Sequence, residues 1–455
     1  MSTSSSSILY TVKRQEPMLV VPKEATPREL KPLSDIDDQQ GLRFQVPLIM
    51  FYEPNPSMQG QDPVGVIREG LAKALVFYYP FAWRLIEGPN RKLVVDCTSD
   101  GVLFVEAYAE VELNQLGDAI LPGSPLLEEL IHEVPGSDGI LGCPLLLLQV
   151  TRFRCGGFAL AVRVNHTMTD TVGLVQFLNA VAELAAQGKK VAAPCVLPVW
   201  QRDQVLSARH PPRITCLHHE YEQVPDTISN TKTNMIQKSF FFGPNDITTI
   251  QNHHLPPDCS ASTFEVLTAF LWRCRTRALA FDSDPNITVR ISCVVNGRGF
   301  PSLNIPHGYY GNVIAYAAAV SKAGKVCSSP LEYLVELVKM ARAQASAEYF
   351  RSAADLMVIK GRPSYTVPGN FIVSDMRRLG FDGVDFGWGK PAYAGSVVAF
   401  PLISAYNRFK GGTVVSMCFP ETVMERFEEE VKKMTKEPFD GPIGHHGPPK
   451  ISSML

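Results

Sequence analysis

The sequence predicts an α/β protein made of two domains of similar size. The chain has 455 residues, which is longer than a single domain with one hydrophobic core usually is. Strand-like and helix-like periodicities alternate in the first half and return after a long stretch rich in proline and charge. No repeat of ~20–50 residues is visible, which excludes a solenoid. We therefore expect an N-terminal domain at 1–200, a crossover loop at 201–230 and a C-terminal domain at 231–455.

The N-terminal half is predicted to contain two pairs of strands and two helices. Apolar residues recur at helical spacing over 64–78, and Pro80 closes this helix. A second helix over 171–186 is amphipathic and stops at Gly188. The strands are expected at 92–96, 101–106, 145–152 and 157–165.

The C-terminal half follows a stretch of loop from 189 to about 226, and periodicity returns at 239–242. Ser262 or Thr263 is expected to cap the next helix. Helices are expected at 263–279 and 330–342, and strands at 287–295, 313–320 and 395–402. The tail after Lys436 is rich in Gly, Pro and His and is expected to be loose.

Charge and composition restrict the partners and the compartment. The formal net charge of −2 argues against binding to nucleic acid. No apolar run approaches the ~20 residues of a membrane span, and residues 1–7 lack the basic and apolar regions of a signal peptide. We therefore expect a soluble intracellular protein in the cytoplasm, without a membrane partner. The C-terminal Ser453-Met454-Leu455 resembles the Ser-Lys-Leu peroxisomal signal with its basic residue replaced, so a peroxisomal address stays open.

The ten cysteines are dispersed along the chain and form no C-x-x-C pair. In a chain of this size, that pattern favours reduced thiols over a disulfide framework or a zinc site. No bound metal is expected.

The run His166-Thr167-Met168-Thr169-Asp170 contains a candidate general base. His166 follows an apolar strand and precedes a helix, which is where α/β proteins bind ligands. A neutral imidazole, with an ordinary pKa near ~6.5, suits removal of a hydroxyl proton at neutral pH. Position alone leaves equally open a hydrogen-bonded core histidine with Asp170 as a helix cap. A second His-x-x-x-Asp copy, His254 to Asp258, contains two prolines and is interpreted as a surface turn.

A second motif, Asp385-Phe386-Gly387-Trp388-Gly389, makes the pattern specific. In this order the two runs resemble the plant BAHD acyltransferase family, whose signatures are HxxxD and DFGWG. The resemblance covers residues 8–435 and is closest to the alcohol acyltransferases of that family, particularly benzyl alcohol benzoyltransferases. That closer likeness rests on the segments 34–45 and 211–221. Further matches lie at 33–37, 79–82, 262–265, 295–298 and 309–312.

The resemblance implies a fold and a reaction. The fold would be two chloramphenicol-acetyltransferase-like domains, each a mixed β-sheet flanked by helices, with an active-site tunnel between them. A segment near 370–400 would pack into the N-terminal domain. The protein would be a monomer with no permanently bound cofactor and with acyl-CoA as co-substrate. The leading reaction is transfer of benzoyl from benzoyl-CoA to benzyl alcohol or a similar small alcohol, by direct general-base-assisted attack on the thioester.

Two alternatives remain beside that reaction. The same chemistry could serve aliphatic alcohols or an alkaloid hydroxyl, because an apolar pocket discriminates weakly between small groups. A non-catalytic binding module on the same scaffold is disfavoured, since peptide-synthetase condensation domains carry a doubled His where this chain has Asn165 before His166.

The resemblance also implies roles for individual residues. His166 would be the base, while Asp170 would pair with Arg298, aided by Asn312, and hold the loop in shape. The residues on the CoA side or shaping its channel would be Ser262, Thr263, Ser374, Asp385, Phe386, Gly387, Trp388 and Gly389. The acceptor pocket would be lined by Ile36, Phe44, Phe51, Trp83 and Leu303.

Three departures from the family pattern limit these assignments. Trp83 stands where the family usually has Gly, and either narrows the pocket or repacks the core. Thr171 replaces the commoner Gly after Asp170. Met376 stands where hydroxycinnamoyl-transferring members carry a Trp, and Met cannot donate a hydrogen bond to an oxyanion.

Overall fold

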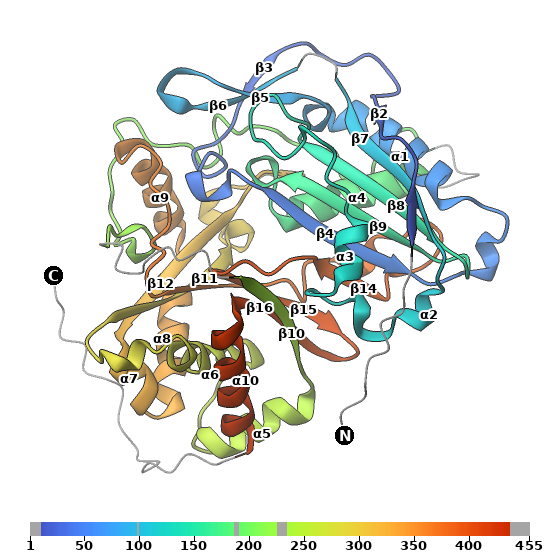
Figure 1. Ribbon diagram of the computed structural model, residues 1–455. Coiled ribbons are helices and arrows are strands. Elements are labelled where there is room, and N and C mark those ends of the chain that lie inside the picture. Colours follow the sequence, from blue (N-terminus) through green and yellow to red (C-terminus); the bar gives the residue numbers. More distant parts are fainter. Residues whose placement is uncertain (1–10, 98–99, 186–190, 225–233, 437–455) are drawn as a thin grey trace.

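The computed structural model describes residues 11–97, 100–185, 191–224 and 234–436. Two large sheets covered by helices form the molecule, one built mainly from the first half of the chain and one from the second (Figure 1). The predicted α/β class is confirmed. None of the described helices is long and apolar enough to cross a membrane.

The first large sheet has seven strands among the described residues, in the order β1-β7-β8-β9-β4-β14, with β2 also paired to β7. It is mixed, since β7 and β8 run parallel while the other pairs are antiparallel. Every residue of β9 is buried, because helices cover both faces of the sheet. The strands are β1 (Val12–Arg14), β2 (Met18–Val20), β4 (Gln45–Tyr52), β7 (Val102–Ala109), β8 (Leu146–Phe153), β9 (Phe158–Asn165) and β14 (Tyr393–Ser396). The helices of this part are α1 (Pro63–Phe77), α2 (Leu113–Leu116), α3 (Pro125–Leu130) and α4 (Thr171–Ala185).

Within the described ranges, the second large sheet has six strands in the order β10-β16-β15-β13-β11-β12. Here β13 runs parallel to both of its neighbours. The strands are β10 (Met235–Phe242), β11 (Thr288–Asn296), β12 (Ile314–Lys322), β13 (Asn370–Asp375), β15 (Ile403–Phe409) and β16 (Gly412–Pro420). The helices are α5 (Pro244–His254), α6 (Thr263–Ala278), α7 (Ala323–Ser328), α8 (Leu331–Gln344), α9 (Ala347–Ile359) and α10 (Glu421–Lys436). A three-stranded sheet of β3 (Leu30–Pro32), β6 (Leu93–Asp96) and β5 (Arg84–Glu87) lies beside the first sheet.

Most of the predicted elements are confirmed to within three residues. They correspond to α1, β6, β7, β8, β9 and α4 in the first half and to α6, β11, β12 and α8 in the second. Ser262 is the residue that caps α6, because its hydroxyl accepts from the backbone of Glu265 and the Glu265 carboxylate accepts from the backbone of Ser262. Gly188 and the tail after Lys436 lie outside the described residues.

The strand predicted at 395–402 is wrong. β14 ends at Ser396 and β15 begins at Ile403, and the two belong to different sheets. β14 pairs with β4, whereas β15 pairs with β13 and β16. The chain therefore crosses from one sheet to the other over 397–402, and one apolar run in the sequence serves as a linker between two strands.

The surface turn predicted for His254 to Asp258 is confirmed for Pro257 and Asp258, which are exposed in a turn, and is wrong for His254. His254 is the last residue of α5, is buried, and its Nε2 lies 2.5 Å from the Met434 carbonyl oxygen. The helix ends before Pro256 and Pro257, so the two prolines stop the helix without preventing it.

The Asp385–Gly389 run anchors the second half of the chain on the first sheet. The Trp388 ring meets Phe158 of β9 edge to face at 5.2 Å. The Asp385 Oδ1 accepts hydrogen bonds of 2.7 Å from the backbone of Gly387 and of Gly389, both at positive φ, which glycine adopts without strain. This anchor precedes β14, which pairs with β4 as an edge strand of the first sheet. That strand lies in the segment near 370–400 that was expected to pack into the N-terminal domain.

Loss of the Trp388 ring should destabilise the fold. Trp388→Ala removes a buried aromatic side chain and should lower the free energy of unfolding by about 3–5 kcal/mol. The control Phe241→Ala removes an exposed ring, 48 % accessible, and should change it by less than about 0.5 kcal/mol. Thermal denaturation measures both, and equal shifts in Tm would contradict the anchoring role.

Candidate active site

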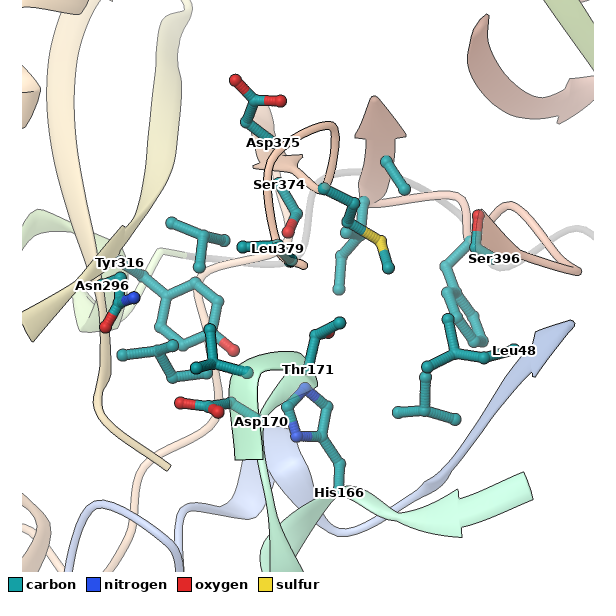
Figure 2. A pocket seen from close by; sticks show the side chains of 18 of the residues that line it. Leu48, His166, Asp170, Thr171, Asn296, Tyr316, Ser374, Asp375, Leu379 and Ser396 are labelled. Carbon is teal, nitrogen blue, oxygen red and sulfur yellow. The ribbon is translucent and has the colours of Figure 1, made fainter. Parts of the chain in front are cut away.

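A cavity of about 140 Å³ lies between the two large sheets. His166, at the end of β9, and Thr171, at the start of α4, line it together with strands from both sheets (Figure 2). Its apolar wall consists of Phe44, Val46, Leu48, Val172, Val294, Ile314, Tyr316, Met376, Leu379, Val398, Phe400, Ile403 and Ala405. Its polar residues are His166, Asp170, Thr171, Asn296, Ser374, Asp375 and Ser396. Because both sheets contribute, the cavity depends on their assembly.

His166 begins a short 3₁₀ turn, η6 (His166–Met168), directly after β9. Its backbone N–H donates to the Phe44 carbonyl at 2.9 Å, and its ring meets the Phe44 ring edge to face at 5.5 Å. Nδ1 is enclosed and has no hydrogen-bond partner among the described residues. That leaves Nε2 as the nitrogen that can face the cavity, as the interpretation of His166 as a general base requires.

The surroundings of His166 favour a neutral imidazole. Burial lowers its pKa below the ordinary value, because an apolar environment disfavours the imidazolium form. The Asp170 carboxylate and the nearby Asn312 amide act in the opposite direction but do not reverse the shift. At neutral pH the ring is therefore able to accept a proton.

Asp170 satisfies three groups, none of which is the imidazole. Its Oδ2 accepts from Arg298 Nη1 at 2.6 Å and from the Val313 backbone at 2.9 Å. Its Oδ1 accepts from the Gly173 backbone at 2.9 Å and so caps α4. The ion pair expected with Arg298 is present, and Asp170 is a helix cap as well. In Figure 2 its carboxylate points aside from the His166 ring.

Asn312 reaches the same turn from the second half of the chain. Its Nδ2 donates to the His166 carbonyl at 2.8 Å and to Asp37 Oδ1 at 2.9 Å. It is fully buried, so these bonds form away from water. Asn312 is therefore placed where it can help to hold the loop that carries His166, as expected.

Of the five residues predicted to line an acceptor pocket, the structure brings Phe44 to this cavity. Ile36, Phe51 and Trp83 are instead buried in core clusters, and Leu303 packs against one of them. In β4, Val46 and Leu48 face the cavity, and alternation along the strand turns Phe51 to the opposite face. Trp83 is therefore part of the packed core and does not narrow the cavity at His166.

Several lining residues were missed by the sequence analysis. Tyr316 comes from β12, and Phe400 comes from the linker between β14 and β15. Ile314 and Tyr316 alternate along their strand as Val46 and Leu48 do along β4, so strand parity was a usable signal. Which face would meet the other sheet could not be read from that parity alone.

A larger cavity, of about 1030 Å³, lies at the start of α6. Ser262 and Thr263 line it, as does Asp375, which also lines the cavity at His166. Its charged lining residues are Glu265, Arg342, Asp375, Arg377, Arg378 and Arg408, a surplus of positive charge. Ser374, expected on the CoA side, lies in the His166 cavity beside this junction.

None of the residues 385–389 lines either cavity. The segments before and after this run, Met376–Asp382 and Lys390–Ala394, line a neighbouring cavity of about 430 Å³. Residues 385–389 therefore hold the two flanking segments in place without lining either of the other two cavities themselves.

No group of three His, Cys, Asp or Glu side chains within the described ranges could hold a metal ion. All ten cysteines lie in those ranges and are free thiols.

Comparisons with known proteins identify the family. The model of the Transferase family matches residues 10–434. Alcohol acyltransferase 16 of Actinidia chinensis var. chinensis is 62 % identical, covering 97 % of this chain and 98 % of its own. Benzyl alcohol O-benzoyltransferase of Petunia hybrida is 51 % identical, covering 96 % of each chain. The crystal structure of vinorine synthase shares the fold, with a TM-score of 0.71 at 23 % identity, covering 93 % of this chain and 98 % of that one.

The chain therefore belongs to the Transferase family, the BAHD acyltransferases that its two motifs resemble. The predicted class of enzyme, an acyltransferase, is confirmed with it.

The Asp170–Arg298 pair should contribute to stability more than an exposed pair does. Asp170→Ala leaves the Arg298 guanidinium and two backbone N–H groups without their acceptor, and should cost about 3–5 kcal/mol. The control Asp382→Ala breaks an exposed pair with Arg408 and should cost at most about 1 kcal/mol. Thermal denaturation compares them, and a Tm unchanged by Asp170→Ala would contradict this account.

Proposed function

We propose that this acyltransferase moves an acyl group from an acyl-CoA to a small alcohol, with benzoyl-CoA and benzyl alcohol as the leading pair. The observation that carries the proposal is His166, with Nε2 free in an apolar cavity between the two sheets. The names of the relatives support the same class of acceptor, since they include alcohol acyltransferases and a benzyl alcohol O-benzoyltransferase.

In the proposed step, His166 Nε2 accepts the alcohol proton while the alcohol oxygen attacks the thioester carbonyl carbon. An alcohol is too weak an acid to ionise beforehand, so proton transfer accompanies formation of the C–O bond. The tetrahedral intermediate then collapses, the C–S bond breaks, and the CoA thiolate takes the proton from the imidazolium. A thiol pKa of about 8.5 makes this sulfur a good leaving group. No covalent acyl-enzyme is needed.

The oxyanion needs donors other than Met376. The Met376 side chain lines the cavity but offers no N–H or O–H. The Thr171 and Ser374 hydroxyls line the same cavity and make no hydrogen bond to another described residue. We propose these two hydroxyls as the donors, a role typically worth about 2.7–4 kcal/mol per donor.

The larger basic cavity suits the phosphates of CoA. Arg378 lines it and has no ion-pair partner among the described residues, while Ser262 and Thr263 present the N-terminus of α6. Asp375 lines both cavities, so the two are adjacent. An acyl-CoA with its CoA phosphates in the basic cavity would extend its thioester past Ser374 toward His166. The Asp385–Gly389 run would shape this route by fixing the segments beside it.

The wall of the His166 cavity favours an uncharged acceptor. Its lining contains no Lys or Arg to pair with an acidic alcohol. Phe44 and Phe400 meet edge to face at 5.4 Å and offer an aromatic surface to a flat ring. An aliphatic alcohol or an alkaloid hydroxyl is the second candidate acceptor, because one methylene in an apolar pocket changes binding by only ~1–3 kcal/mol.

We also propose that the protein acts as a monomer in the cytoplasm. Ser453-Met454-Leu455 lies outside the described residues, so its peroxisomal interpretation stays a prediction.

Removal of the His166 imidazole should slow turnover by orders of magnitude. His166→Ala should lower kcat by roughly 10²–10⁴-fold, the usual contribution of a general base. The assay is release of free CoA thiol, together with ester formation, over a panel of acyl-CoA donors and of aromatic, aliphatic and alkaloid alcohols. An equally active His166→Ala would contradict the proposed base. Preference for an aliphatic alcohol over benzyl alcohol would contradict the leading pair alone.

Activity should persist to mildly acidic pH. The base must be neutral, and burial lowers the pKa of His166, so the neutral form survives below the ordinary value of ~6.5. The acid limb of the kcat profile should therefore have its midpoint below about 6.5, with a plateau above it. A midpoint above 7 would contradict the assignment.

A further inference from the structure

Three successive carbonyl groups of the η6 turn are held by two side chains. The His166 carbonyl accepts from Asn312 Nδ2 at 2.8 Å. The Thr167 carbonyl accepts from Arg202 Nη1 at 3.3 Å, and the Met168 carbonyl accepts from Arg202 Nη2. These oxygens lie at the end of a buried strand, where an unpaired carbonyl would be costly. The turn that carries the imidazole is thus fixed through its backbone.

Asp37 joins these two side chains. Its Oδ1 accepts from the Asn312 backbone N–H at 2.8 Å and from Asn312 Nδ2 at 2.9 Å. Its Oδ2 lies 3.3 Å from Arg202 Nη1 and also accepts from the Ser34 hydroxyl at 2.7 Å. Both side chains of the Asp37–Arg202 pair are completely buried. The guanidinium stacks on the Trp200 ring at 4.0 Å, which further limits its movement.

Stability alone is a weak reason for such a pair. Two charges without exposure must be desolvated, and apolar side chains of similar volume usually stabilise a core at least as well. A guanidinium differs from them because its planar N–H groups reach two oxygens in a fixed geometry. Here the two oxygens belong to the residues that directly follow His166.

We propose that Asp37 and Arg202 are positioning residues for His166. Asp37 orients the Arg202 guanidinium and the Asn312 amide, and these hold the backbone of residues 166–168 so that Nε2 faces the reacting hydroxyl. This inference rests on the proposed role of His166 as the base. The Asp170–Arg298 pair fixes the other end of the same loop, so the imidazole is aligned from both sides.

The test compares two buried aspartates. Asp37→Asn keeps the shape of the side chain and removes the charge that orients Arg202. The matched control is Asp355→Asn, whose carboxylate is equally buried and pairs with Arg209 at 2.6 Å, but lines neither cavity and makes no contact with residues 166–170. Both variants are assayed with benzoyl-CoA and benzyl alcohol, or with the best pair from the panel.

Asp37→Asn should lower kcat per CoA-binding site at least ~10-fold, because a small misplacement of a catalytic group can cost up to ~100-fold. Its KM for acyl-CoA and its Kd for CoA should stay within twofold of the wild-type values, since the basic cavity is untouched. Asp355→Asn should lower Tm and leave kcat per CoA-binding site unchanged. A purely structural role of Asp37 would give the Asp355→Asn pattern and overturn the proposal.

Arg202→Lys provides a second variant in case Asp37→Asn does not fold. It keeps the charge pair with Asp37 but loses the planar fork that spans two carbonyls. A fall in kcat with unchanged KM supports the proposal, and a kcat within twofold of wild type overturns it. Loss of activity in His166→Ala beside full activity in these variants would overturn this inference alone. An active His166→Ala would instead remove the proposed base.

Discussion

The loop from His166 to Asp170 has to leave a strand buried on both faces and enter a helix within five residues. In that space its backbone cannot satisfy its own polar groups, and no bulk water is at hand to do so. The Asn165 side chain accepts from the Thr167 N–H, but the three carbonyls of residues 166–168 are satisfied by distant segments, through Arg202 and Asn312. At the other end of the loop the Asp170 carboxylate caps α4 and pairs with Arg298. The arrangement of the two halves follows from this requirement, because Arg298 and Asn312 come from one half and the loop from the other.

The same contact between halves creates the cavity and sets its chemistry. β14 adds a strand of the second half to the first sheet, and the linker at 397–402 then runs along the cavity to β15. The walls that result are apolar, so the imidazole is poorly solvated and the pKa of His166 falls. A neutral imidazole at His166 is thus a consequence of the packing of two sheets, and no neighbouring carboxylate is required to produce it.

The sequence predicted the parts whose periodicity is local. β8, β9, α4 and α6 were predictable because each buries a continuous run or one regular face. The break between β14 and β15 was not, since a run that changes sheets has the same apolar composition as one strand. The prediction of the pocket-lining residues was mostly wrong for a related reason. Phe51 and Leu48 share a strand, and only the position of the second sheet decides which of them meets the cavity. Asp37 and Arg202 carry no local signal of their partnership, because their contact depends on the assembled fold.

The two acidic anchors of the loop differ in a way that explains why neither needs to touch the imidazole. Asp170 binds the loop at the helix end, while Asp37 acts through Arg202 and Asn312 at the strand end. An anionic carboxylate hydrogen-bonded to the imidazole would stabilise the imidazolium and raise the pKa of His166. Both carboxylates are instead occupied by arginine and amide donors, and Nδ1 has no partner among the described residues. Geometry is thereby fixed through the backbone, and the basicity of the ring is left to the apolar cavity.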